Sequence, residues 1–100
     1  FFFFLLHKAA KAGASMIKLF PAGAVGPDYV KNILAPLPFL RILVTGGVSF
    51  EEASIKAWLN SGVVALGIGS SVFSKERITG RDYAAVESDI KRIASYARLK

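Results

Sequence analysis

The chain has no cysteine, one histidine and only seven acidic residues among its 100. The lack of cysteine excludes disulfides within the chain and thiol catalysis. A single histidine, His7, excludes a metal site built from several histidines, and no metal is expected. The acidic residues are outnumbered by 13 lysines and arginines, and the resulting net charge of +6 suits an anionic small-molecule substrate. These basic residues are scattered and not interleaved with aromatic residues, so no nucleic-acid partner is predicted.

Long apolar runs are also lacking. Phe1–Leu6 is apolar but too short to span a bilayer, and no basic segment precedes it. We therefore predict no membrane partner and take a cytoplasmic location as the default. Hydrophobic residues nevertheless make up 53% of the chain, which is high for this length. We expect part of this apolar surface to contact a partner subunit or a further segment of chain.

Strand and helix patterns alternate along the chain. Helical composition from Leu5 to Ala12 ends at Gly13, a typical C-cap residue. Strands are predicted at Ser15–Phe20, Arg41–Thr45 and Val63–Ile68, and helices at Pro27–Leu34, from an N-cap at Ser49 to Asn60, and at Asp82–Lys100. Ser49 and Glu52 match a capping box for the middle helix.

This alternation predicts an α/β fold of parallel βα units. Two architectures fit, a small open doubly wound sheet and a segment of a (β/α)8 barrel. Three strands are too few to close a barrel, since a complete one takes about 250 residues. In the second case about half of the barrel would lie outside this chain.

Lys18 is the unusual residue of the first predicted strand, Ser15–Phe20. The strand is so apolar that we expect both of its faces to be buried, as in parallel sheets covered by helices. Lysine is rarely buried without a partner, and burial favours the free amine, which can attack a carbonyl to form a Schiff base. The alternative is a lysine at a barrel rim that extends its ammonium to water.

Glycine and a hydroxyl residue stand together at the end of each remaining strand, in Thr45-Gly46-Gly47 and in Gly67-Ile68-Gly69-Ser70. Glycine lets the backbone approach a ligand and present its N–H groups. Barrel enzymes often bind phosphate with the loops after their last two strands and a short helix, which Ser70–Phe73 would open. Ordinary βα turns are the alternative. A dinucleotide fingerprint is set aside because Val72 occupies the position of its third glycine.

In this order and spacing, four motifs resemble the C-terminal half of the 2-keto-3-deoxy-6-phosphogluconate (KDPG) and 4-hydroxy-2-oxoglutarate aldolases: Ile17–Ala22, Val25–Pro27, Thr45–Val48 and Gly67–Ser70. The resemblance covers the chain from about Leu5 onward. It implies that residues 1–100 are a single partial domain, strands six to eight of a (β/α)8 TIM barrel with their helices. It also implies a class I aldolase without metal or other cofactor, typically a trimer.

The resemblance implies a role for each motif. Lys18 would be the catalytic Schiff-base lysine in a reaction that cleaves KDPG to pyruvate and glyceraldehyde 3-phosphate. The remaining site residues would be Phe20, Pro21 and Thr45 for substrate binding, and Gly46, Gly47, Gly69 and Ser70 for phosphate binding.

Parts of the family pattern are not in this chain. The general-base glutamate and the carboxylate-binding arginine and threonine come from earlier strands, Phe1–Phe4 replace a polar helix start, and Val44 replaces a proline. Little activity is therefore expected from the isolated chain. Two other hypotheses remain: a non-catalytic half-barrel fragment that oligomerises through its open sheet edge, or another phosphate-binding barrel enzyme in which Lys18 is a simple cation.

Overall fold

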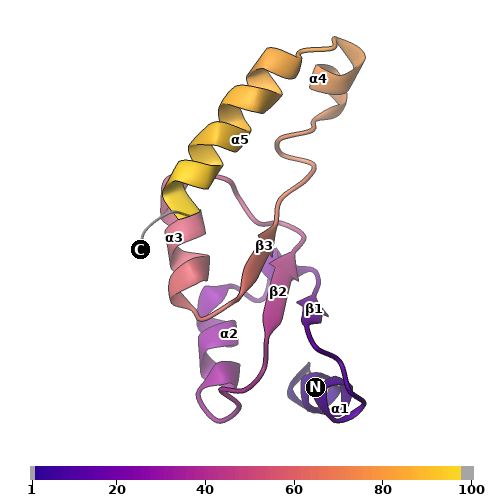
Figure 1. The fold of residues 1–100 in the computed structure, drawn as a ribbon, viewed down its shortest axis with the longest axis vertical. Helices are drawn as coiled ribbons and strands as arrows, with labels where there is room; N and C mark the ends of the chain where they lie inside the picture. The colour runs from indigo at the N-terminus through magenta and orange to yellow at the C-terminus, as the bar shows by residue number, and fades with distance from the viewer. Residues whose placement is uncertain (1, 98–100) are drawn as a thin grey trace.

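The computed structural model describes the backbone of residues 2–97 and the side chains of residues 6–97. Its elements are α1 (Phe2–Lys11), β1 (Ile17–Leu19), the 3₁₀ turn η1 (Ala22–Ala24), α2 (Pro27–Leu34), β2 (Ile42–Thr45), α3 (Glu52–Asn60), β3 (Ala65–Gly67), α4 (Lys75–Thr79) and α5 (Tyr83–Ala97). The strands form one parallel sheet in the order β1-β2-β3, with α2 and α3 connecting successive strands (Figure 1). The predicted alternation of βα units is confirmed.

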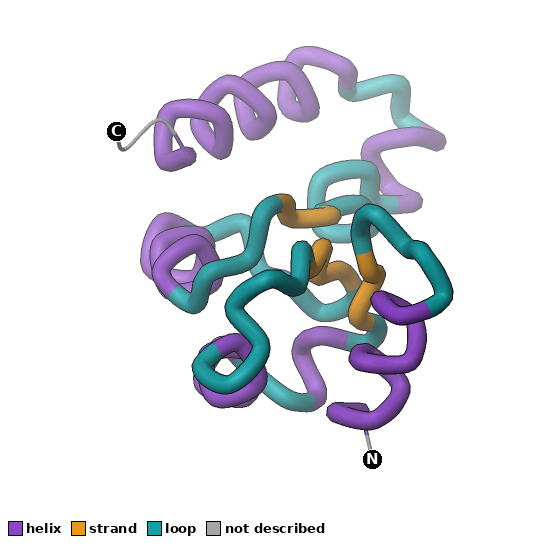
Figure 2. Tube along the Cα trace, turned by 60° about the horizontal axis from the view of Figure 1, so that its bottom comes forward, coloured by secondary structure: helices purple, strands orange, loops and turns teal. Residues whose placement is uncertain are grey.

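One face of the sheet forms the core of the molecule. Ile17 pairs with Ile42 and Leu19 with Val44 across β1 and β2, and all four side chains are buried. Val30 of α2 and Trp58 of α3 belong to the same apolar cluster. Figures 1 and 2 show α2 and α3 on the same side of the strands. The helices and the sheet therefore share one hydrophobic layer.

This arrangement is that of a barrel wall. A doubly wound sheet carries helices on both faces and changes strand order at a switch point. Here the strand order follows the chain, and α2 and α3 pack on one face only. The barrel segment, one of the two architectures that the sequence allows, is thus confirmed.

The predicted burial of both faces of β1 is wrong. Ile17 and Leu19 are buried, but Lys18 between them is exposed. No element among residues 2–97 covers the face on which Lys18 lies, so the burial proposed for its amine does not occur in this chain. The same alternation recurs in β2, where Ile42 and Val44 are buried and Leu43 and Thr45 only partly so.

The predicted capping box at Ser49 is wrong as well. The helix begins at Glu52, with Glu51 as N-cap residue and no side-chain hydrogen bond at the cap. The Ser49 hydroxyl instead accepts the N–H of Glu51 at 3.2 Å, because the chain makes a turn before α3 starts. Glu52 faces Lys56 at 3.6 Å along the helix surface.

The segment after β3 differs in detail from its prediction. Ser70–Phe73 does not open a helix but forms a turn, in which the N–H groups of Val72 and Phe73 both donate to the carbonyl of Gly69. The next helix, α4, starts at Lys75 with Ser74 as its N-cap residue. The last helix starts at Tyr83, and its predicted end at Lys100 lies outside the described residues.

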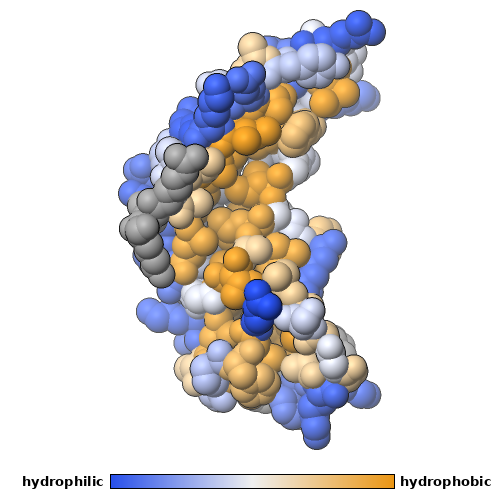
Figure 3. Space-filling model, in the orientation of Figure 1, coloured by the Kyte–Doolittle hydropathy of each residue, from blue (hydrophilic) through white to orange (hydrophobic). Residues whose placement is uncertain are grey.

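The molecule exposes more surface than a compact protein of its mass. Its accessible area is 6612 Å², whereas a monomer of 10.7 kDa is expected to expose about 5,500 Å². An apolar groove of about 510 Å³ lies between β3, α3 and α5, and Figure 3 shows hydrophobic residues gathered there. None of the helices within residues 2–97 is long and apolar enough to cross a membrane.

Two loops meet at a pair of glycines beyond the ends of β1 and β2. The N–H of Gly23 donates to the carbonyl of Gly46 at 2.8 Å. A Cβ atom on Gly23 would lie 2.8 Å from the carbonyl oxygen of Gly47, too close for any side chain. Gly47 itself has a φ of 75°, in the region that favours glycine. This contact fixes the position of the first loop against the second.

Gly23→Ala is therefore expected to lower the free energy of unfolding by about 1–3 kcal/mol, because the new methyl group overlaps backbone atoms that have little room to shift. Urea unfolding in phosphate-free buffer measures the effect. Gly69→Ala is the matched control, since no heavy atom lies within 4 Å of its added Cβ, and it should change stability by less than about 0.5 kcal/mol. Equal stability of the two variants would contradict the prediction.

Candidate active site

The uncovered face of the sheet presents its residues in rows across the strands. Lys18 pairs with Leu43, which pairs with Ala65, and these form one row. Thr45 and Gly67 pair in the next row, toward the carboxyl ends of the strands. Two residues along a strand span about 6.6 Å. The backbone of Lys18 therefore lies one row below Thr45, on the same face.

A hollow of about 440 Å³ opens at the carboxyl ends of the strands. Six predicted site residues line it, drawn from the segments that follow all three strands. None of the lining residues carries a charged side chain. The full lining consists of Phe20, Thr45, Gly46, Gly47, Val48, Ser49, Gly67, Gly69, Ser70 and Ser71.

Lys18 and Pro21, the other two predicted site residues, lie next to the hollow but do not line it. The Nζ atom of Lys18 is 5.8 Å from the centroid of the Phe20 ring, and that ring belongs to a residue that lines the hollow. Pro21 packs next to Gly46. A Cβ atom added to Gly46 would lie 3.1 Å from the Pro21 Cα atom and 2.5 Å from the Phe20 ring. Gly46 therefore allows Phe20 and Pro21 to pack against the loop that follows β2.

Four of the residues that line the hollow have backbone N–H groups without a hydrogen-bond partner among the described residues. Those of Gly46, Gly47, Ser70 and Ser71 donate to no acceptor within residues 2–97. Gly46 and Gly47 both have positive φ, which only glycine adopts readily. N–H groups without a partner are uncommon unless they face solvent or a ligand. Four of them from two loops around one hollow can bind an anion without any cationic side chain.

Four lining residues are missing from the sequence-based prediction. Gly67 belongs to the motif Gly67–Ser70, and Ser71 directly follows it. Their position at the end of the third strand could therefore have identified them as site residues. A Cβ on Gly67 would lie 2.8 Å from the Thr45 hydroxyl, so glycine makes room for that side chain. Ser49 carries a helix-cap prediction instead, and Val48, a buried residue, belongs to the Thr45–Val48 motif but has no predicted role of its own.

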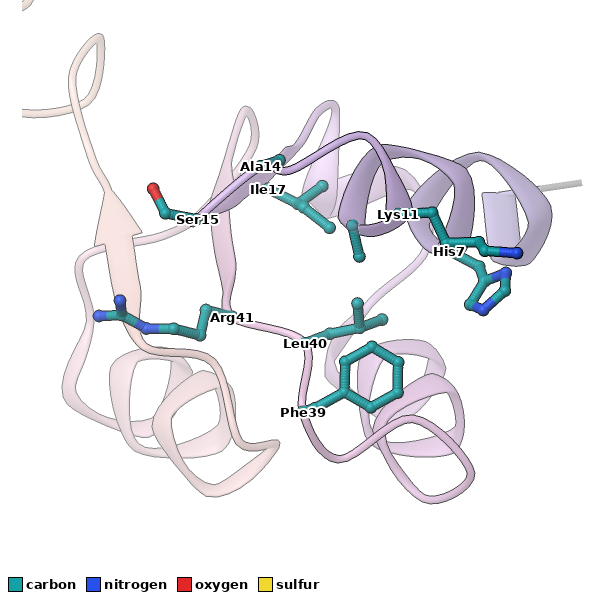
Figure 4. Close-up of a pocket in the computed structure, with 9 residues that line it drawn as sticks. His7, Lys11, Ala14, Ser15, Ile17, Phe39, Leu40 and Arg41 are labelled. Carbon is teal, nitrogen blue, oxygen red and sulfur yellow. The ribbon is translucent and has the colours of Figure 1, made fainter.

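A smaller hollow of about 240 Å³ lies at the opposite, amino end of the strands. His7, Lys11 and Arg41 line it and suggest a second anion site. Figure 4 shows, however, that the guanidinium of Arg41 extends away from His7 and Lys11. Because these groups do not converge on one point, the candidate active site is the hollow at the carboxyl ends.

Comparison with known proteins assigns a family to the part of the sequence that forms this site. The model of the KDPG and KHG aldolases matches residues 5–88, which include every predicted site residue. The 2-dehydro-3-deoxy-6-phosphogalactonate aldolase of Escherichia coli (strain K12) is 36% identical over 66 residues, which are 65% of this chain and 31% of that protein. A probable 2-dehydro-3-deoxy-6-phosphogalactonate aldolase of Rhizobium meliloti (strain 1021) is 42% identical over 66 residues, 65% of this chain and 30% of that protein.

A solved structure described as "Native KDPGal structure" has the same fold over most of this chain. Its TM-score is 0.63 at 29% sequence identity, and the match covers 89% of this chain and 44% of that one. The chain thus spans about a third of the length of the curated relatives and less than half of the solved chain. Since the family model matches well over half of its residues, the chain belongs to the KDPG and KHG aldolase family.

Proposed function

We propose that this chain carries the Schiff-base lysine and the phosphate-binding loops of an aldolase that cleaves a 2-keto-3-deoxy-6-phospho sugar acid. The observation that carries the proposal is the placement of four free N–H groups around one hollow, one row above Lys18 on the same face of the sheet. KDPG is the substrate predicted from the sequence, and its galactonate counterpart is the one named for the two relatives. Cleavage between C3 and C4 gives pyruvate and glyceraldehyde 3-phosphate from either sugar acid.

Lys18 is the nucleophile of this proposal. Its free amine adds to the C2 carbonyl of the keto acid, and loss of water gives a protonated imine. When the C4 hydroxyl loses its proton, the C3–C4 bond breaks, glyceraldehyde 3-phosphate leaves, and the bond electrons move to the imine as an enamine. Protonation at C3 and hydrolysis then release pyruvate and restore the amine. The exposed position of Lys18 leaves room for a substrate.

The substrate phosphate is proposed to lie in the hollow, on Gly46, Gly47, Gly69 and Ser70. Backbone donors suit a phosphate because they are numerous, closely spaced and fixed by the fold. Phe20 and Pro21 would shape the substrate pocket beside Lys18, and Thr45 would contact the substrate next to them. Lys18 adds positive charge within reach of the same ligand.

The remaining catalytic groups are proposed to come from protein outside these residues. No carboxylate lines the described hollow, so the general base and the groups that bind the substrate carboxylate must come from other parts of the protein.

The assembly proposed for this enzyme is a trimer in the cytoplasm. The second candidate, a half-barrel fragment without activity that oligomerises, is favoured by one observation, the excess of exposed surface, which is larger than one side of a standard interface of about 800 Å².

Borohydride reduction in the presence of pyruvate tests the role of Lys18. Because the reduced imine is a stable secondary amine, we expect the mass of one pyruvyl adduct, located at Lys18 by peptide mapping. Lys18→Met should abolish the adduct. Lys31→Met removes an exposed lysine of α2 and should leave the adduct unchanged. No adduct at saturating pyruvate would contradict the proposed nucleophile.

Inorganic phosphate tests the hollow independently of the chemistry. A ligand that binds only the folded state raises the unfolding temperature with concentration, so millimolar phosphate should stabilise the chain beyond an equal ionic strength of chloride. Ser70→Pro deletes one of the free N–H groups and should reduce the gain, whereas Ser70→Ala keeps that N–H and should retain most of it. Equal gains in the two variants would show that the backbone donor of Ser70 does not bind phosphate.

A further inference from the structure

A buried carboxylate lies outside the hollow, on the last helix. Asp89 of α5 is only 6% exposed and binds two arginines. Its Oδ2 atom is 2.5 Å from Nη1 of Arg77, and its Oδ1 atom is 2.8 Å from Nη2 of Arg92. A buried charge is tolerated when it is paired and hydrogen-bonded, and Asp89 meets both conditions. Nothing in the proposed chemistry uses this cluster directly.

Arg77 connects Asp89 to the loop that follows β3. The same Nη1 atom that binds the carboxylate also donates to the carbonyl of Val72 at 3.0 Å. Val72 closes the turn that contains Ser70 and Ser71, because its own N–H donates to the carbonyl of Gly69 at 3.0 Å. The guanidinium therefore holds one end of the turn that carries two of the free N–H groups.

Arg92 connects Asp89 to the loop that follows β2. Its guanidinium carbon is 5.6 Å from the centroid of the Phe50 ring, within the range of a cation–π contact. Phe50 stands between Gly47 and the start of α3, in the segment that carries the other two free N–H groups. One carboxylate thus reaches both loops of the hollow, each through one arginine.

We propose that Asp89 is a positioning residue for the phosphate site. Through Arg77 and Arg92 it holds the two loops at the spacing that lets their N–H groups converge on one anion. The inference rests on the proposed function, because it assumes that phosphate binds in the hollow. Both loops lack regular secondary structure, so without this anchor part of the binding free energy would be spent on ordering them.

A phosphate titration of the isotope-labelled chain, followed by NMR at the amides of Gly47 and Ser70, tests this role directly. Asp89→Asn should weaken the affinity for inorganic phosphate roughly three- to tenfold, the effect of one net hydrogen bond. Glu87→Gln is the matched control on the same helix. Glu87 pairs with Lys91 at 2.8 Å on the exposed surface and contacts neither loop, so its variant should bind within about twofold of the parent chain.

Two further variants separate the loops. Arg77→Met should shift the amide resonances of Ser70 and Ser71 in the unliganded chain and weaken phosphate binding, while Arg92→Met should shift those of Gly46 and Gly47. If Asp89→Asn does not fold, Arg77→Gln takes its place with the same expected loss, because the shorter side chain cannot span Asp89 and Val72. A merely structural role would lower the unfolding temperature of these variants without changing the affinity of the folded protein.

The outcomes distinguish this inference from the function on which it rests. If the parent chain does not bind phosphate, the proposed phosphate site is wrong and the positioning role falls with it. If the parent chain binds and the folded Asp89 or Arg77 variant binds within twofold of it, the positioning role alone is wrong. Weaker binding in both variants, with the Glu87 control unchanged, supports it.

Discussion

The packing of one sheet face against α2 and α3 is the interaction on which the rest of the structure depends. Ile17, Leu19, Ile42 and Val44 are buried on that face, and burying four aliphatic side chains stabilises the fold by about 1.5–3 kcal/mol each, as an upper estimate. Because successive strand residues point to opposite faces, the same packing turns Lys18 and Thr45 the other way. The core therefore decides which side chains face the site.

Much of this fold was predictable because its signals are local. Pro27 at the first position of α2 and the Ala35-Pro36 break after it define that helix, and its observed bounds agree with the prediction. The burial of β1 was not predictable, since an apolar strand has the same composition whether one face or both faces are covered. The role of Ser49 was missed for a similar reason, because a turn and a helix cap use the same hydroxyl.

In the candidate site, too, the features that local motifs encode were predictable from the sequence, whereas contacts between distant side chains were not. Glycine motifs at the ends of parallel strands must meet at one edge of the sheet, so the sequence alone predicts that Gly46 and Ser70 lie near one another, and both line the hollow. The Asp89 cluster could not be found this way. Its ion pair with Arg77 joins two helices across 12 residues, and charged residues are too common for such a pairing to stand out.

The proposed phosphate site is built from main-chain donors, and this has a consequence for how the sequence can evolve. Because the peptide N–H is common to every residue except proline, most substitutions around the hollow leave its donors in place. The glycines that resist exchange are those with positive φ, such as Gly47, and those with no room for a Cβ atom, such as Gly67. Homologous chains can then diverge widely in side chains while conserving the same anion-binding geometry. In an enzyme that works as proposed, specificity for one sugar acid over another would evolve in the residues around the carbon skeleton, independently of the phosphate end.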